Sequence, residues 1–317
     1  MGNITMGMAS SHAFAVLDPS EWDDSRQRNR LGYQRRYNTL PPEQPGVAEE
    51  TDDSVSHRYA HIRDAFDAIR ARLTEIPPDA LVMVADDQNE NFTETNLPQI
   101  AIYVGERFVA GRADAESSVH RSHPALAEAI LRTCVEADID MACVRKLPED
   151  RLFAHAFGPV LHVIDPEGKI PVVPVFVNAI HMPAPSPSRC YLLGQTIRTA
   201  VEAFDGAEKV AVYGSGGLSH FTAGYPYAHY HGPFNYGGID VQFDRWLVER
   251  MQAGDGEALA ALSVKDLLEH GEIELRSWIT VLGAVGSVKP QLLAYEPFYR
   301  GLMGMGVASW DAAPAES

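Results

Sequence analysis

Short β-type runs alternate with longer amphipathic stretches along this chain, and this alternation is what most constrains its fold. Residues 56–75 carry apolar side chains at three- and four-residue steps, which is the period of a helix with one buried face. The alternation predicts a single large α/β domain, residues 1–317, with a central, mostly parallel mixed sheet and helices on both faces. Strands are predicted over residues 3–9, 80–84, 100–104, 159–164, 172–178 and 209–213, and further helices over 124–137, 190–204, 240–252 and 272–284.

Two polar segments fall outside this alternation. Residues 19–54 are rich in Arg, Asn, Gln, Pro and Glu, and the segment is too long and too hydrophilic for a simple connection. We therefore expect a surface excursion or lid there. Residues 308–317 are expected to form a tail.

Charge and cysteine content limit the classes of partner and compartment. The chain has 43 acidic and 26 basic residues, a net charge of −17, which argues against nucleic-acid binding and against a polybasic membrane patch. No apolar run reaches the roughly 20 residues of a membrane span, and the first ten residues lack the features of a signal peptide. The three cysteines do not have the spacing of a disulfide framework or zinc ribbon. We expect a cytoplasmic homo-oligomer that binds a small molecule.

Three segments with unusual chemistry follow predicted strands. They are Ser11-His12, residues 86–88 (Asp-Asp-Gln) and residues 214–220 (GSGGLSH). Ligands of α/β sheets bind beyond the carboxyl ends of the strands, so the active site is predicted at this edge. Adjacent glycines permit a tight turn and close approach to a ligand, but the spacing fits neither a nucleotide fingerprint nor a nucleophile elbow.

A pair of acidic residues begins the last predicted helix. Glu272 and Glu274 precede its apolar positions, where carboxylates interact favourably with the helix dipole. Either could instead be a carboxylate ligand of a metal ion. Both interpretations stay open on the residues alone.

The order of these segments resembles a known family. His12, the segment at residues 85–92, His155, GGLSH ending at His220 and ELRSW at residues 274–278 occur in the order found in class III extradiol ring-cleavage dioxygenases, typified by the protocatechuate 4,5-dioxygenase β subunit. The resemblance spans roughly residues 5–310. Its Asp-Asp-Gln segment is similar to the 3-O-methylgallate dioxygenase branch.

This resemblance implies a reaction and a set of roles. The family inserts O₂ into catechol- or gallate-like hydroxylated aromatics at a non-haem Fe(II) held by two histidines and a carboxylate. His12 and Glu274 match metal ligands. His220 matches the catalytic base, and His155 matches a second active-site histidine that assists acid chemistry or oxygen binding.

One position departs from the family pattern. The second histidine ligand is replaced by Gln88, whose amide oxygen is a weaker neutral donor. His57 and His61 lie four residues apart on one helical face, so either could supply the missing imidazole, although two solvated histidines in the first turns of the helix are the more common case. Asp86, Asp87 and Glu90 could orient a ligand or form an acidic turn. The departure leaves open a metal-dependent hydrolase or lyase, a heterocycle dioxygenase, or a degenerate non-catalytic subunit.

Candidate substrate contacts lie in two further segments. Residues 224–238 are rich in aromatic side chains, and Tyr225, Tyr227 and His229 could wall an aromatic pocket or form an oligomer contact. Arg189 could pair with a substrate carboxylate or cap the following helix.

Overall fold

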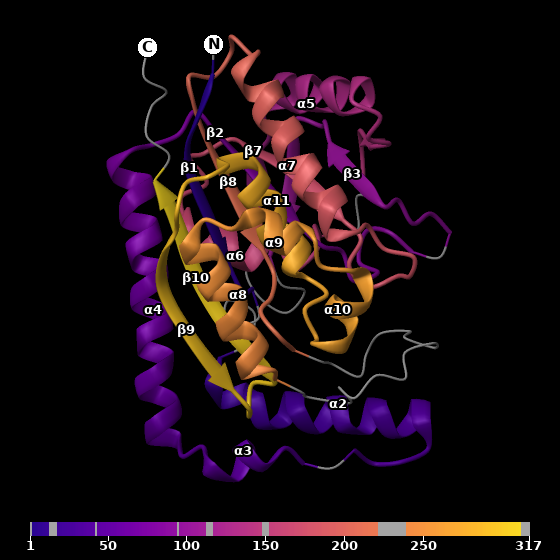
Figure 1. Cartoon of the computed structure of the whole chain (residues 1–317), viewed down its shortest axis with the longest axis vertical. Helices are drawn as coiled ribbons and strands as arrows, with labels where there is room; N and C mark the ends of the chain where they lie inside the picture. The colour runs from indigo at the N-terminus through magenta and orange to yellow at the C-terminus, as the bar shows by residue number, and fades with distance from the viewer. Residues whose placement is uncertain are drawn as a thin grey trace.

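One eight-stranded sheet forms the centre of the protein, as the computed structural model in Figure 1 shows. The structure describes residues 2–12, 18–41, 43–93, 95–111, 117–147, 152–220 and 239–311. The order across the sheet is β6, β3, β7, β2, β8, β1, β10, β9. The strand bounds are Asn3–Ser10 (β1), Ala80–Ala85 (β2), Ile100–Tyr103 (β3), Ala142–Val144 (β6), Val172–Val177 (β7), Lys209–Ser215 (β8), Gln291–Phe298 (β9) and Met303–Asp311 (β10).

Parallel pairing in the middle of the sheet brings three loops together. Strands β7, β2, β8 and β1 are successive parallel neighbours, whereas β10 pairs antiparallel with β1 and with β9. At the other side, β3 is antiparallel to β7 and parallel to β6. Parallel strands end at the same edge, so the segments that follow β1, β2 and β8 meet there. The predicted fold class is confirmed.

Helices bury both faces of the sheet, which is why its central strands are continuous apolar runs. Side chains alternate along β2: Val82 and Val84 belong to the core that α7 and α11 cover, and Leu81 and Met83 to the core that α4 and α6 cover. The helix bounds are Asp52–Glu75 (α4), Pro124–Glu136 (α5), Gly158–Ile164 (α6), Pro187–Glu202 (α7), Val241–Ala253 (α8), Gly256–Ala260 (α9), Val264–Glu269 (α10) and Leu275–Val285 (α11). A separate hairpin pairs Arg107–Ala110 (β4) with Ser118–Arg121 (β5).

The polar excursion at residues 19–54 is largely helical. It contains a short 3₁₀ helix, Pro19–Glu21, followed by α2 (Trp22–Tyr37) and α3 (Pro45–Glu49). Trp22 anchors it, because its ring is buried edge-on against Tyr59 of α4 and Phe298 of β9. Figure 1 shows α2 and α3 at the end of the molecule where the parallel strands terminate.

The structure corrects two predicted elements. Residues 159–164 form helix α6 rather than a strand, because a short apolar run fits either element and Pro159 suits the first turn of a helix. The predicted tail at 308–317 starts too early, since Ala308–Asp311 complete β10 and pair with β1. The described residues contain no helix that is both long and apolar enough to cross a membrane.

Candidate functional site

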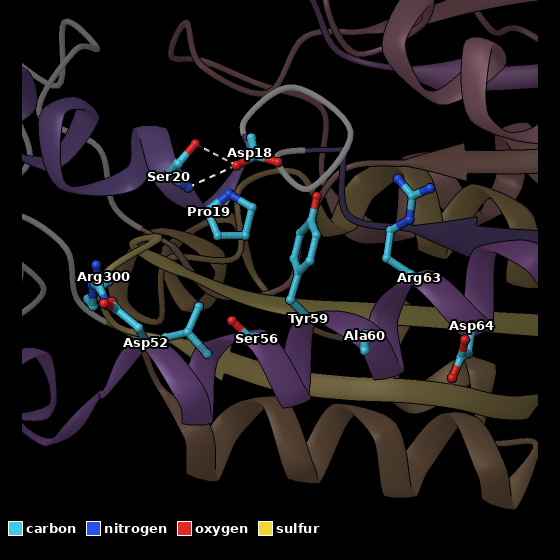
Figure 2. Close-up of a pocket in the computed structure, with 11 residues that line it drawn as sticks. Asp18, Pro19, Ser20, Asp52, Ser56, Tyr59, Ala60, Arg63, Asp64 and Arg300 are labelled. Atoms are coloured by element: carbon cyan, nitrogen blue, oxygen red, sulfur yellow. Dashed lines mark hydrogen bonds and ion pairs between the residues drawn. The ribbon is translucent and has the colours of Figure 1, made fainter.

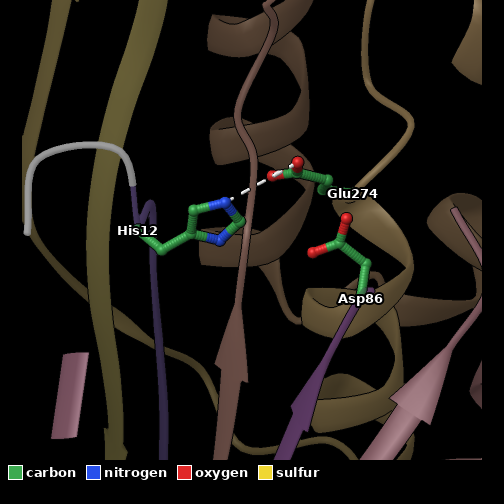
Figure 3. A group of neighbouring side chains, drawn as sticks. All are labelled: His12, Asp86 and Glu274. Atoms are coloured by element: carbon green, nitrogen blue, oxygen red, sulfur yellow. Dashed lines mark ion pairs between the residues drawn. The ribbon is translucent and has the colours of Figure 1, made fainter. Parts of the chain in front are cut away.

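Three buried side chains meet beyond the ends of the parallel strands. His12 follows β1, Asp86 follows β2, and Glu274 immediately precedes α11. Figure 3 shows the three side chains facing one another, and a ligand atom from each lies within 4.8 Å of the other two. Their exposed fractions are 3%, 3% and 2%, so the cluster is shielded from water. These side chains form the candidate metal cluster.

Hydrogen bonds give His12 the tautomer that a metal ligand needs. The Ser215 hydroxyl donates to the carbonyl of Ala156 at 2.6 Å, so at 3.5 Å from His12 Nδ1 it accepts the proton of that nitrogen. The lone pair of His12 is then on Nε2, which lies 3.8 Å from Glu274 Oε1. Burial lowers the pKa of His12 to about 4, which outweighs the opposing charge of Glu274. His12 is therefore neutral at physiological pH.

Glu274 is positioned by the two-glycine turn. Its Oε2 accepts the Gly217 N–H at 2.9 Å, and a Cβ on Gly216 would lie 2.7 Å from the Glu274 Cβ. Gly216 has φ +133°, a region that other residues rarely adopt. Trp278, one turn into α11, donates Nε1–H to the Gly216 carbonyl at 2.5 Å. The GGLSH and ELRSW motifs thus form one packed unit.

The other acidic candidate of this segment, Glu272, lies outside the cluster. It is fully buried, and burial together with the neighbouring Asp244 carboxylate raises its pKa well above the usual range. The Glu274 side chain makes no capping hydrogen bond to α11. Glu274 is therefore the one of the two that is directed into the cluster.

Asp86 brings a second carboxylate next to Glu274. Its Oδ2 accepts a hydrogen bond from Gln88 Nε2 at 3.1 Å, and the same amide group donates to Glu274 Oε1 at 2.9 Å. Among the described residues, Asp86 Oδ1 has no hydrogen-bond partner. Burial, followed by the charge of Glu274, raises the pKa of Asp86 well above its usual range. Two adjacent buried carboxylates that face an imidazole fit a divalent cation.

His155 lies against His12 on the side of helix α6. Its Nε2 is 3.1 Å from His12 Nε2, and its Nδ1 is 2.7 Å from Glu90 Oε1. Burial alone would lower the pKa of His155, but the hydrogen bond and charge of Glu90 raise it to about 9. The protonated ring donates to both neighbours, so His155 is a proton donor held at the cluster.

His220 contacts the cluster at Glu274. Its Nδ1–H donates to the Leu218 carbonyl at 2.8 Å, and its Nε2 lies 3.3 Å from Glu274 Oε1. Burial lowers the pKa of His220, but the charge of Glu274 outweighs this and raises it to about 9. Ser219 fixes the turn, because its N–H and hydroxyl both donate to the buried Asp244 carboxylate, at 3.0 and 2.8 Å.

Other residues predicted from the sequence lie elsewhere. His57 and His61 are exposed on α4, and His61 Nδ1 forms an ion pair with Glu296 Oε1 at 2.9 Å, so neither joins the cluster. Arg189 donates to the Asp138 carbonyl at 3.3 Å rather than to any cluster residue. Tyr225, Tyr227 and His229 are outside the described residues.

Two acidic residues contact the site more directly than the sequence indicated. Asp86 was expected at most to orient a ligand, but it belongs to the cluster itself, and Glu90 holds His155. Asp87 has the structural role, since it accepts the backbone N–H groups of Asn91 and Phe92. The signal for Asp86 was its place directly after a fully buried strand.

A surface pocket of about 670 Å³ lies along the first turns of α4, apart from this cluster. Figure 2 shows Tyr59 and Arg63 on one side of it and Asp18 with Pro19 on the other. The cluster residues do not line this pocket. It is therefore not the place where the cluster could meet a substrate.

Comparison with known proteins gives one family and several relatives. Residues 40–308 match the family described as the catalytic LigB subunit of aromatic ring-opening dioxygenase. A 2,3-dihydroxyphenylpropionate/2,3-dihydroxicinnamic acid 1,2-dioxygenase from Rhodococcus sp. is 24% identical over 77% of this chain and 89% of its own length. The Klebsiella pneumoniae protein of that name is 30% identical over 48% of this chain and 46% of its own length. A Pseudomonas putida gallate dioxygenase is 29% identical over 52% of this chain and 46% of its own length. The matched segment thus spans about half the length of the last two relatives.

Proposed function

The chain belongs to the LigB family of catalytic subunits of aromatic ring-opening dioxygenases, and from this premise we propose that it uses Fe(II) and O₂ to open the ring of a catechol- or gallate-like substrate. The observation that carries the proposal is the buried cluster of His12, Asp86 and Glu274 at the carboxyl ends of parallel strands. It offers a neutral imidazole and carboxylates, the donors that suit Fe(II). The reaction would take place at this cluster, between His155 and His220.

His12 and Glu274 would hold the iron. When bound, Fe(II) would lower the pKa of an aromatic hydroxyl and bring the vicinal diol and O₂ together. Each of the two residues is already oriented: Ser215 fixes the ring of His12, and the Gly217 N–H fixes the carboxylate of Glu274. Such supporting hydrogen bonds keep metal ligands in place.

His220 and His155 would move protons. The negative charge of Glu274 keeps a proton on His220 Nε2, and a cation bound to Glu274 would offset that charge. His220 Nε2 would then be free to accept the proton of a substrate hydroxyl, while its Nδ1–H stays bound to Leu218. On the other side, His155 would donate a proton, because Glu90 keeps its ring charged.

Oxygen uptake tests the proposal. Protein loaded with Fe(II) under anaerobic conditions is mixed with catechol, gallate or 2,3-dihydroxyphenylpropionate and then given O₂. We expect one O₂ consumed per substrate and a new near-ultraviolet or visible band from the ring-opened product. His220→Ala and Glu274→Ala should abolish turnover, whereas His162→Gln, at an exposed histidine of α6, should retain it.

Two results would contradict the proposal. One is absence of O₂ uptake across a wider panel of hydroxylated aromatics. The other is product formation without O₂, which would support a metal-dependent hydrolase or lyase on the same fold. The homo-oligomeric state expected from the sequence is measured separately, by size exclusion with light scattering.

A further inference from the structure

We propose that Asp86 occupies the coordination position for which the family pattern has a histidine, so that one imidazole and two carboxylates, from His12, Asp86 and Glu274, bind the metal. This inference deepens the proposed function, because it defines the ligand set of the same site. It differs from the two-histidine, one-carboxylate set that the resemblance implies. It also predicts metal binding that is measurable without any substrate.

The position of the Asp86 carboxylate is the first argument. The side chain is 3% exposed, and among the described residues its Oδ1 has no hydrogen-bond donor. Burying a carboxylate oxygen without a partner is unfavourable, and a bound cation would compensate this cost. Figure 3 shows this carboxylate next to that of Glu274, with the ring of His12 facing both, so a cation bound among them would contact all three side chains.

The ion pairs of the cluster give the second argument. In the described part of the chain, the ion-pair partners of Glu274 are His12 and His220, and Asp86 forms no ion pair. Both of these partners contact Glu274, so Asp86, the second buried carboxylate of the cluster, has no cationic partner among the described residues. A divalent cation would supply the charge that faces Asp86.

Gln88 acts as a positioning residue in this arrangement. Its single NH₂ group donates to Asp86 Oδ2 and to Glu274 Oε1, which holds the two carboxylates side by side. Coordination through the amide oxygen would require the side chain to turn and release both hydrogen bonds. The network therefore favours Asp86 over Gln88 as the metal ligand.

The two histidines of α4 that the sequence offered as substitutes do not compete for the position. His57 and His61 are exposed on α4, and Glu296 holds His61 there. The set with two carboxylates also has one more negative charge than a two-histidine set. Oxygen-rich sites of this kind suit Mn²⁺ and Fe²⁺ better than softer metal ions.

Manganese binding to the metal-free full-length chain tests the inference. Mn²⁺ is added to chelator-treated protein, and the free ion is followed by electron paramagnetic resonance. We expect one bound ion. Pulsed resonance of the complex, which counts directly coordinated imidazole nitrogens, should find one in the wild type and none in His12→Ala.

Variants rank the contributions of the neighbouring residues. Asp86→Asn should weaken Mn²⁺ binding at least tenfold, and Gln88→Ala only a few-fold, because Gln88 positions the ligands without binding the ion. Asp165→Asn is the matched control: this aspartate is also buried, but its carboxylate accepts the Lys169 and Ile170 N–H groups outside the cluster. Its Mn²⁺ affinity should equal that of the wild type.

Each contrary result points to a different error. Two coordinated imidazoles in the wild type, or wild-type affinity in a folded Asp86→Asn variant, would overturn the inference. A larger loss in Gln88→Ala than in Asp86→Asn would make Gln88 the ligand and would also overturn it. If Mn²⁺ binds as expected but Fe(II) protein consumes no O₂ with any hydroxylated aromatic, the inference stands and the proposed function fails.

Discussion

At the scale of single residues, hydrogen-bond direction decides what each histidine of the site can do. His12 and His220 are buried and His155 is partly buried, yet only His12 has a lowered pKa. Ser215 and Ala156 set the tautomer of His12, whereas carboxylates keep the other two charged. The same type of side chain thus offers a lone pair in one place and a proton in another.

The pKa of His155 provides a test of this assignment. Burial lowers that pKa, and the hydrogen bond that His155 donates to Glu90, with the charge of Glu90, more than reverses the effect and raises the pKa to about 9. Glu90→Gln removes the charge, so in metal-free protein the His155 ring should lose its proton at a pH well below 9. NMR titration of the imidazole signals measures this shift.

A matched substitution controls for the change of charge alone. Glu106→Gln alters an exposed glutamate and should leave the His155 titration unchanged. If His155 still titrates near pH 9 in Glu90→Gln, Glu90 is not what keeps the ring charged. The proposed role of His155 as a proton donor held by Glu90 would then be wrong.

A substitution at Gly216 tests how closely the two-glycine turn approaches the cluster. Gly216→Ala places a Cβ 2.7 Å from the Glu274 Cβ at φ +133°, so the free energy of unfolding should fall by about 1–3 kcal/mol. Mn²⁺ affinity should fall with it, since Glu274 must shift. Gly32→Ala, within helix α2, would place a Cβ no closer than 3.8 Å to another side chain and should instead stabilise the protein by about 0.5–1 kcal/mol. Chemical denaturation measures both, and a neutral Gly216→Ala would contradict the steric argument.

At the scale of elements, Arg300 docks the polar excursion onto the sheet. Its guanidinium donates to Asp23 in α2 and to Asp52 at the start of α4, each at 2.6 Å. Arg300→Ala should therefore speed tryptic cleavage within α2 at neutral pH. Arg70→Ala, which breaks an exposed pair with Asp67 inside α4, should leave that rate unchanged.

The contribution of Arg300 depends on pH in a defined direction. The hydrogen bond from Arg300 lowers the pKa of Asp23, despite an opposing effect of burial. A carboxyl group whose pKa is lower in the folded state stabilises that state above its unfolded pKa of about 4 and loses the effect as pH falls. The difference between wild type and Arg300→Ala should thus shrink below pH 4. A difference that persists there would mean that Arg300 acts by packing.

Some secondary-structure elements were predictable from the sequence and others were not. Central strands such as β2 and β8 were found because strands buried on both faces are continuous apolar runs. The residues of helix α6 form an equally apolar run. The spacing of apolar residues in so short a run does not distinguish a helix from a strand. The edge strand β9 is only partly buried and lacks a run of that kind.

The candidate site was predictable in part, for a related reason. His12 and His220 follow predicted strands and Glu274 precedes a predicted helix, which local patterns indicate, whereas His155 was identified only through the family resemblance. The Gln88 amide donates hydrogen bonds to the carboxylates of Asp86 and Glu274 and holds them together. Gln88 and Glu274 are 186 residues apart in the sequence. Spacing along the chain carries no signal for such a contact.

At the scale of the whole molecule, the cluster joins segments from both ends of the chain, so metal binding should stabilise the entire fold. His12 follows the first strand, Asp86 the second, and Glu274 begins the last helix. A ligand that binds only the folded state at 100 times its dissociation constant adds about 2.7 kcal/mol to the free energy of unfolding. For a domain of this size we expect a rise in Tm of roughly 5 °C with Mn²⁺. Differential scanning calorimetry measures it, and excess chelator should reverse it. Asp165→Asn should show the full rise and Asp86→Asn little of it; equal rises in the two variants would place the ion elsewhere.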